Sequence, residues 1–355
     1  MKIHLLSGFL GSGKTTAIQQ ACKQLQEKDI SVGVISNDQG IQLVDSNFFN
    51  SLSIPNRKII NGCFCCNYHD LNSSITSFET SEQPETIFAE AVGSCTDIVA
   101  TVLKPLRSNK ENVDVTLSTF VDVRLFHLLF IQKLPLFDAS VKYIYNKQLE
   151  EALVIVINKV DLADAKMLQS VSQYVKDHYP NKTILYQNSF SEASVQEWLN
   201  VINTKGLYDA PVSTDIDYDI YGEGESKLAW LDTDLEFSAP AFNAIHCVNV
   251  FIKTLRRLIE ENHLTIGHLK LLLNGKNKYS LTSVHTETEH LFDESAANKD
   301  ASLLVNARVQ TEPAILKHLL WKAVRNTEVL CKCSIRMENT ASFKPGYPKP
   351  VYRMK

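Results

Sequence analysis

The sequence predicts an α/β fold, in which a mostly parallel sheet is covered by helices and a small α+β domain follows. Short apolar runs recur along the first half of the chain, and helix-like segments of mixed charge lie between them. Strands that alternate with helices are typical of parallel sheets covered on both faces. The predicted strands are residues 3–6, 32–36, 86–92, 115–123, 153–157 and 183–187. At 355 residues the chain is long enough for two domains with separate cores.

A glycine-rich loop between the first predicted strand and a helix-like run reads Gly-Phe-Leu-Gly-Ser-Gly-Lys-Thr, of the form G-x-x-x-x-G-K-[ST]. This is the context that a phosphate-binding loop requires. Its glycines allow backbone N–H groups to face phosphate oxygens. Lys14 supplies positive charge, and the Thr15 hydroxyl is suited to Mg²⁺. We therefore predict a nucleoside triphosphate site rather than a chance turn, with Gly8, Gly11, Ser12, Gly13, Lys14, Thr15 and Thr16 as its residues.

The base preference is predicted by Asn158-Lys159-Val160-Asp161, which follows the buried-looking strand 153–157. A carboxylate here can accept hydrogen bonds from N1–H and the exocyclic amine of guanine, whereas adenine lacks that donor pair. A site built for paired polar contacts rejects a ligand that leaves them unpaired. The alternative is a polar turn after a core strand. We predict guanine, with Asn158, Lys159 and Asp161 as binding residues.

Three thiols lie within four residues, at Cys63, Cys65 and Cys66. Thiolates are soft ligands suited to zinc or copper(I). A closed structural zinc site needs four ligands, so three clustered cysteines leave one coordination position open. Such a site suits transfer or sensing of a metal better than permanent binding. The alternative is a set of redox-inert thiols, or a disulfide in a loop.

Together these motifs resemble those of the CobW-type GTPases, a metal-handling branch related to the urease and hydrogenase accessory GTPases. Residues 8–16 match the phosphate loop of that family. Its N-E-F-G switch motif corresponds to Asn37-Asp38-Gln39-Gly40, with Asp45 as the later acidic residue. Its C-x-C-C motif corresponds to the three thiols, and its E-x-x-G motif to Glu90-Ala91-Val92-Gly93.

The resemblance implies a GTPase whose hydrolysis gates delivery of a transition metal, zinc- or cobalt-like, or of a metallocofactor to a client protein. It implies Lys14, Asp38, Glu90 and Gly93 as catalytic residues, with Asp45 as the alternative to Asp38. Thr15 and Glu90 would hold Mg²⁺. A non-catalytic GTP-dependent metal sensor or scaffold is the alternative function. An adenine-nucleotide kinase would need an acceptor site and a lid, for which we find no sequence pattern.

The predicted domain organisation has four parts: a P-loop GTPase domain at 1–205, an acidic linker at 206–240, an α+β domain at 241–330 and an extended tail at 331–355. The linker is predicted from crowded Asp and Glu residues, which also leave open a metal-collecting patch. Residues 241–325 read as strand (244–247), helix (250–261), three strands (264–274, 278–285 and 302–308) and helix (312–324). The last helix is expected to begin at Glu312-Pro313, because proline is tolerated in the first turn.

Other candidate ligands are weaker. His285 and His290 flank a Thr-Glu-Thr-Glu stretch, and Cys331 and Cys333 offer two thiols on one face of a strand. Cys95 follows Gly93 closely and is either a small buried residue or a further member of the thiol cluster. Cys22 and Cys247 lie in apolar runs and are expected in the core.

The composition of the chain limits the classes of partner that we expect. The net charge of −4 gives no basic footprint for nucleic acid. No apolar stretch approaches the length of a membrane span. The eight cysteines form no evident disulfide framework, which predicts a reducing, cytoplasmic location. The expected partners are GTP or GDP and a metal-receiving client, and homo-oligomerisation is left open.

Overall fold

The structure is a computed structural model that describes residues 1–37, 44–60, 62–110, 113–204, 213–285, 291–295 and 297–355. The chain divides into two compact units. Unit 1 comprises Met1–Gln39, Ser53–Gly224 and Tyr347–Lys355, and unit 2 comprises Gly40–Leu52 and Glu225–Gly346. Each unit therefore contains segments that are distant in sequence.

Unit 1 is built on a seven-stranded sheet with the strand order β3-β2-β4-β1-β5-β6-β7. All neighbouring strands pair in parallel. The strands are β1 (Lys2–Ser7), β2 (Val32–Asn37), β3 (Asn56–Ile59), β4 (Thr86–Glu90), β5 (Asp114–Asp122), β6 (Val154–Asn158) and β7 (Thr183–Gln187). Because β1 is central, the loop that follows it opens at the middle of the C-terminal edge of the sheet, where ligands bind in such folds.

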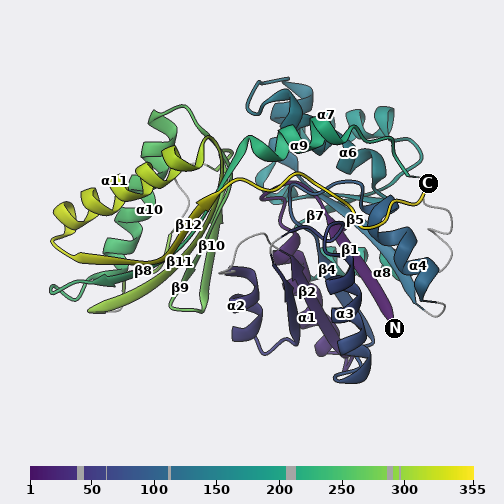
Figure 1. The fold of residues 1–355 in the computed structure, drawn as a ribbon, viewed down its shortest axis with the longest axis horizontal. Coiled ribbons are helices and arrows are strands. Elements are labelled where there is room, and N and C mark those ends of the chain that lie inside the picture. The colour runs from purple at the N-terminus through teal and green to yellow at the C-terminus, as the bar shows by residue number, and fades with distance from the viewer. Residues whose placement is uncertain (38–43, 61, 111–112, 205–212, 286–290, 296) are drawn as a thin grey trace. The chain divides into compact units, whose positions relative to one another are not determined.

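Helices connect these strands and cover the sheet (Figure 1). They are α1 (Lys14–Gln26), α3 (Tyr68–Thr80), α4 (Lys104–Asn109), α5 (Val123–Phe126), α6 (Ala139–Glu151), α7 (Ala165–His178), α8 (Glu192–Ile202) and α9 (Tyr218–Ser226), which ends at the boundary with unit 2. Two π-helical turns, η1 (Val99–Leu103) and η2 (His127–Ile131), and a 3-10 turn, η3 (Val160–Leu162), complete the unit.

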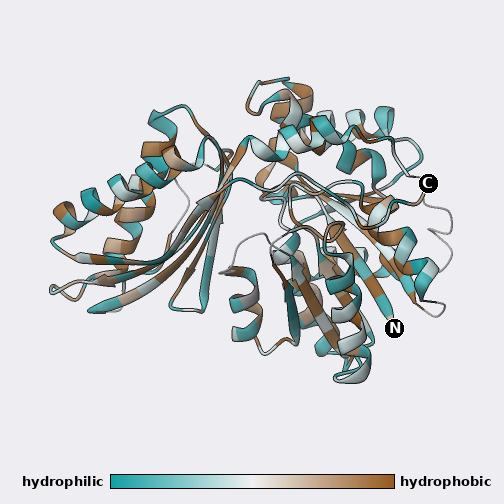
Figure 2. Cartoon of the chain, viewed as in Figure 1, coloured by the Kyte–Doolittle hydropathy of each residue, from teal (hydrophilic) through white to brown (hydrophobic). Residues whose placement is uncertain are grey.

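The core of unit 1 explains why its strands are readable in the sequence. Every residue of β2, β4 and β6 is buried, as expected for parallel strands covered on both faces. The apolar runs are visible as brown strands in Figure 2. The six predicted strands and the α/β class are confirmed. The prediction missed β3, whose sequence Asn-Arg-Lys-Ile is short and polar.

Unit 2 is a five-stranded antiparallel sheet with the order β10-β9-β11-β8-β12. Helices α10 and α11 lie on one face of this sheet and form its main core (Figure 1). Helix α2 packs on other residues of the sheet. Its Val44 and Phe48 contact Leu272 and Leu304. The elements are α2 (Val44–Ser51), β8 (Leu228–Ser238), α10 (Ala244–Glu261), β9 (Thr265–Leu273), β10 (Asn277–Leu281), β11 (Asp300–Gln310), α11 (Pro313–Cys331) and β12 (Ser334–Phe343). The predicted small α+β domain is confirmed, as is the start of its last helix.

The predicted boundaries need correction. The acidic linker at 206–240 is wrong for its described second half, which forms α9 and β8. The prediction missed β8 because its aspartates were read as part of a solvated linker. Apolar residues alternate with these aspartates in β8, and Asp232 is buried against Arg308. The tail predicted at 331–355 includes β12, a charged edge strand that pairs with β8. The strand predicted at 244–247 is the first turn of α10. Its four residues are too few to distinguish a buried strand from a buried helical turn.

Among the described residues, no helix combines the length and the apolarity that crossing a bilayer requires.

Candidate functional site

The phosphate loop joins β1 to α1 in a conformation that only glycine adopts easily. Gly8 and Gly13 have φ angles of 130° and 93°. A Cβ atom on Gly8 would lie 2.2 Å from the carbonyl oxygen of Phe120, and one on Gly13 would lie 2.3 Å from Nδ2 of Asn158. The glycines therefore allow the loop to pack directly against β5 and the end of β6 while its N–H groups remain at the start of α1.

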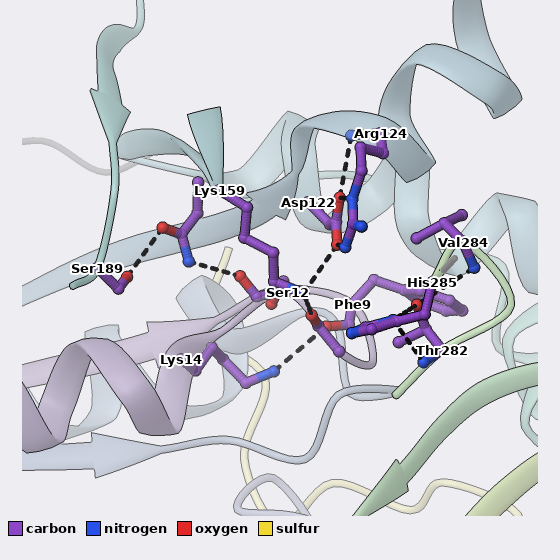
Figure 3. A network of polar contacts seen from close by, with 12 residues as sticks. Phe9, Ser12, Lys14, Asp122, Arg124, Lys159, Ser189, Thr282, Val284 and His285 are labelled. Atoms are coloured by element: carbon purple, nitrogen blue, oxygen red, sulfur yellow. Dashed lines mark hydrogen bonds and ion pairs between the residues drawn. The ribbon is translucent and has the colours of Figure 1, made fainter. Parts of the chain in front are cut away.

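Lys14 and Thr15 begin α1 and are both buried. The Lys14 ammonium donates to the carbonyl oxygens of Gly8 at 2.6 Å and Phe9 at 3.4 Å, so its charge lies inside the loop (Figure 3). The Thr15 hydroxyl lies 3.0 and 2.9 Å from the two carboxylate oxygens of Glu90, at the end of β4. An alcohol and a carboxylate that converge in this way are hard oxygen donors that fit Mg²⁺.

The Asn158–Asp161 segment supports the same loop from β6. The Asn158 side chain donates to the carbonyl oxygen of Ser12 at 2.9 Å and accepts from the Ser189 hydroxyl at 2.8 Å (Figure 3). Lys159, with a φ of 62°, donates to the carbonyl oxygen of Gly11 at 2.7 Å. Asp161 is exposed on η3, where its carboxylate is available to a ligand.

Sequence reasoning missed Asp122, at the end of β5. Its carboxylate pairs with Lys159 at 2.8 Å and with Arg124 at 3.1 Å (Figure 3). Burial alone would raise the pKa of Asp122, but these two cations lower it to about 2. Asp122 is therefore an anion that fixes Lys159 over the phosphate loop. Its position at the C-terminal end of a parallel strand is the sequence feature that points to it.

The three thiols converge in the loop between β3 and α3. The sulfur of Cys63 lies 2.7 Å from that of Cys65 and 3.5 Å from that of Cys66, and the last two are 3.8 Å apart. Four sulfurs around a tetrahedral zinc ion, each about 2.3 Å from it, are about 3.8 Å apart. The contact with Cys63 contributes most to raising the pKa of Cys66, to about 11. A metal ion would therefore have to displace protons from this cluster.

The thiol loop contacts the end of β2 and the segment that follows Gly93. The Asn37 side chain, at the end of β2, donates to the carbonyl oxygen of Gly62 at 2.7 Å. The Cys95 sulfur lies 4.0 Å from that of Cys65 and is fully buried. Cys95 is thus both a buried residue and a neighbour of the thiol cluster.

The backbone after Gly93 is held by two buried polar residues of α6 that the sequence did not single out. Gln148 donates to the carbonyl oxygens of Gly93 at 3.0 Å and Cys95 at 2.8 Å. The Glu151 carboxylate accepts from the Thr96 hydroxyl at 3.0 Å and from the Val99 N–H at 3.2 Å. Burial raises the pKa of Glu151 to about 8. These contacts fix the path of the segment that joins Glu90 to the thiol cluster.

The remaining candidates that the structure describes make contacts of their own. Asp38 and His290 lie outside the described residues. Asp45, in unit 2, forms ion pairs with Lys270 and Lys278, and these cations lower its pKa against the opposing effect of burial. The His285 ring accepts from the Thr282 N–H at 2.9 Å. Four cysteines contribute to cores: Cys22 and Cys247 are buried, while Cys331 and Cys333 pack partly buried against the core of unit 2.

A parallel sheet whose central strand leads into a glycine-rich loop, with Lys14 inside it and Thr15 beside Glu90, defines a P-loop nucleotide-binding protein. Comparison with known families agrees. The family described as CobW/HypB/UreG, nucleotide-binding domain, matches residues 2–186, and the chain belongs to this family.

Two curated proteins and one solved structure illustrate the relationship. The chain is 24% identical over 212 residues to a protein of Sinorhizobium sp named zinc chaperone CobW, covering 54% of this chain and 59% of that protein. It is 24% identical over 240 residues to zinc-regulated GTPase metalloprotein activator 1 of Dictyostelium discoideum, covering 59% and 49%. The chain thus spans about half the length of these relatives. Nickel-bound HypB from Helicobacter pylori matches with a TM-score of 0.43 and 16% identity, over 60% of this chain and 91% of that one.

Proposed function

We propose that this protein binds and hydrolyses GTP and couples its nucleotide state to binding and delivery of a transition metal. The observation that carries the proposal is the contact of the thiol loop with the end of β2, through Asn37, and with the segment that follows Gly93, through Cys95. The names of the two curated relatives, a zinc chaperone and a zinc-regulated activator, favour zinc as the cargo. The receiving client would be a second protein that presents a competing ligand set.

Guanine recognition is assigned to Asp161, with Asn158 and Lys159 as its support. Asn158 is already committed to Ser12 and Ser189, which leaves the exposed carboxylate of Asp161 as the acceptor for the base. Lys159 is fixed by Asp122, so its aliphatic stem is held at the phosphate loop. This arrangement supports discrimination by hydrogen bonding rather than by size.

Replacing Asp161 with asparagine is expected to weaken GTP binding by roughly a hundredfold, because a charge-assisted pair of hydrogen bonds is worth about 2–3 kcal/mol. The amide reverses the donor pattern, so xanthine nucleotides should gain affinity. Calorimetric titration with GTP, ATP and XTP analogues measures both effects. Asp177→Asn, an exposed carboxylate on α7, serves as the control. Equal affinity of the native protein for GTP and ATP analogues would refute the guanine assignment.

Hydrolysis is assigned to residues around the phosphate loop. Lys14 would neutralise charge on the β- and γ-phosphates, and Gly93 would donate its N–H to the γ-phosphate. Thr15 and Glu90 would hold Mg²⁺, which supplies charge neutralisation in phosphoryl transfer when bound. Asp38 is the proposed switch carboxylate, because Asp45 is occupied by two lysines of unit 2.

Glu90→Ala is expected to lower GTP turnover by on the order of a hundredfold, since it removes a charged group beside the reacting phosphate. Phosphate release under single-turnover conditions measures the rate. Asp38→Ala should also lower the rate of GTP turnover. Glu85→Ala changes an exposed carboxylate just before β4 and should leave turnover unchanged. Native rates in both the Glu90 and the Asp38 variants would contradict the assignment.

The alternative function is a GTP-dependent metal sensor that does not turn over its nucleotide. The two are separated by turnover itself: a delivery protein should hydrolyse GTP at a rate that responds to metal or to client, whereas a sensor should bind GTP without hydrolysing it. Purified protein assayed with GTP and Mg²⁺, with and without zinc, gives the answer.

A further inference from the structure

The segment Tyr347–Lys355, called here the tail, belongs to unit 1 and runs over the thiol loop as an extended chain (Figure 1, yellow end). Its backbone donates at three points. The Lys349 N–H lies 3.2 Å from the sulfur of Cys66. The Val351 N–H lies 2.9 Å from the carbonyl oxygen of Cys65. The Met354 N–H lies 2.9 Å from the carbonyl oxygen of Ala100, at η1. The tail thus contacts one thiol directly and the backbone of a second.

Side chains of the tail anchor it on both sides of these contacts. The Arg353 guanidinium donates to Asp97 at 2.8 Å, and that carboxylate also accepts from the Tyr218 hydroxyl at 2.6 Å. Asp97 is only 1% exposed and lies four residues after Gly93, so Arg353 connects the tail to the segment behind the phosphate loop. The Tyr352 ring packs edge-on against Tyr68, at the start of α3, with ring centroids 5.0 Å apart.

The other end of the tail fits against a glycine. A Cβ atom on Gly222 of α9 would lie 2.7 Å from the ring of Tyr347 and 3.4 Å from Pro348. The Tyr347 hydroxyl donates to Asp219 at 2.9 Å, one turn earlier on the same helix. The tail is therefore fixed at two ends, by Arg353 and by Tyr347, and crosses the thiol loop between them.

We propose that the tail is a displaceable strap over the thiol cluster: it closes on Cys65 and Cys66 and is locked by Arg353 on Asp97. The inference rests on the proposed function in that the strap would control entry and release of the metal cargo. Displacement is feasible because the tail has no regular secondary structure and Val351, Tyr352 and Met354 are 38–40% exposed. Segments with few buried contacts open locally at much lower cost than a core.

The position of the Arg353–Asp97 contact would link the strap to the nucleotide site. Asp97 follows Glu90 and Gly93 on one continuous segment, and Cys95 on that segment lies beside Cys65. A shift of the segment on a change of nucleotide would move Asp97 relative to Arg353. The strap would then loosen at the same moment as the thiol loop.

Two pairs of variants test the strap. Lys349→Pro removes the N–H that reaches Cys66, whereas Lys349→Ala keeps it. Arg353→Ala removes the lock, whereas Lys355→Ala removes an exposed charge of the same segment. The measurement is the rate at which iodoacetamide modifies Cys66 in metal-free, reduced protein, followed by mass spectrometry of the peptide that contains residues 63–66. Circular dichroism verifies that each variant is folded.

Loss of a hydrogen bond to a charged group raises the open population by about tenfold to a hundredfold. We therefore expect the Cys66 modification rate to rise by at least about tenfold in Arg353→Ala, to rise by a smaller factor in Lys349→Pro, where the lost bond goes to a neutral thiol, and to stay native in the two controls. Deletion of residues 347–355 should give the largest increase. Equal rates in all variants would overturn the strap.

The rate of zinc release tests the strap and the proposed metal cargo separately. In zinc-loaded protein, a chromogenic chelator should extract the ion faster from Arg353→Ala than from Lys355→Ala. Faster alkylation in a protein that binds no zinc would support the strap and refute the metal cargo. Tight zinc binding with the same alkylation and extraction rates in every variant would support the cargo and refute the strap.

Discussion

Lys14→Ala is expected to abolish nucleotide binding at micromolar GTP and to lower turnover by on the order of 10²–10³. The Lys14 ammonium is buried inside the phosphate loop and donates to carbonyl oxygens there, of which Gly8 gives the shorter contact at 2.6 Å. Incoming phosphates would replace these neutral acceptors by anionic ones. Charge-assisted hydrogen bonds of that kind are about twice as strong as neutral ones. Lys14 therefore stabilises the nucleotide-bound protein more than the free protein.

The matched control is Lys23→Ala, on the same helix. Its ammonium is 70% exposed and lies 3.9 Å from Glu27, an arrangement worth little in water. Titration with a fluorescent GTP analogue, together with a phosphate-release assay, should find the Lys23 variant native and the Lys14 variant inactive. The melting temperature checks that the loop has kept its fold. A Lys14 variant that binds GTP within a few fold of the native protein would contradict the P-loop assignment.

The parts of the site that sequence could predict are those carried by contiguous residues. The phosphate loop, Glu90 and the three thiols each belong to a short motif whose spacing reflects one local conformation. The strands of unit 1 were readable because both faces of a parallel sheet are buried, which makes each strand a continuous apolar run. Strand β8 was missed for the opposite reason, since its aspartates alternate with apolar residues and resemble a solvated linker.

The parts that sequence could not predict are contacts between distant residues. Asp122 becomes informative only when Lys159 and Arg124 are seen against it. Gln148 and Glu151 look like ordinary polar residues of a helix until their partners at Gly93–Val99 are known. The tail approaches Cys66 across 283 residues of sequence, and no local pattern encodes that contact.

Replacing Cys63, Cys65 and Cys66 together with serine is expected to remove about one tightly bound zinc- or cobalt-like ion per chain and to leave the fold intact. A serine hydroxyl is a hard, neutral donor, whereas these metals favour thiolate. The fold should survive because serine is close to cysteine in size, and because most of the apolar core of each unit is built from other residues, although Cys63 and Cys65 are buried. Cys331→Ser with Cys333→Ser is the matched control, since these two thiols lie in unit 2, outside the described cluster. It should retain the ion in elemental analysis.

The native protein should bind the ion with different affinity in the presence of a GTP analogue and of GDP. The coupling would act through Asn37, which holds the carbonyl of Gly62, and through Cys95, which lies 4.0 Å from the sulfur of Cys65. Asn37 precedes Asp38 in the sequence and Cys95 follows Gly93, so under the proposed function a change at the phosphate would alter the spacing of the sulfurs. Linkage requires that the metal change GTP affinity by the same factor, about 5- to 150-fold for a coupled pair of sites. Competition titrations with a zinc chelator in each nucleotide state measure that factor. If the two affinities are identical, the thiols are not a nucleotide-gated cargo site, and the protein is a GTPase with an uncoupled thiol cluster.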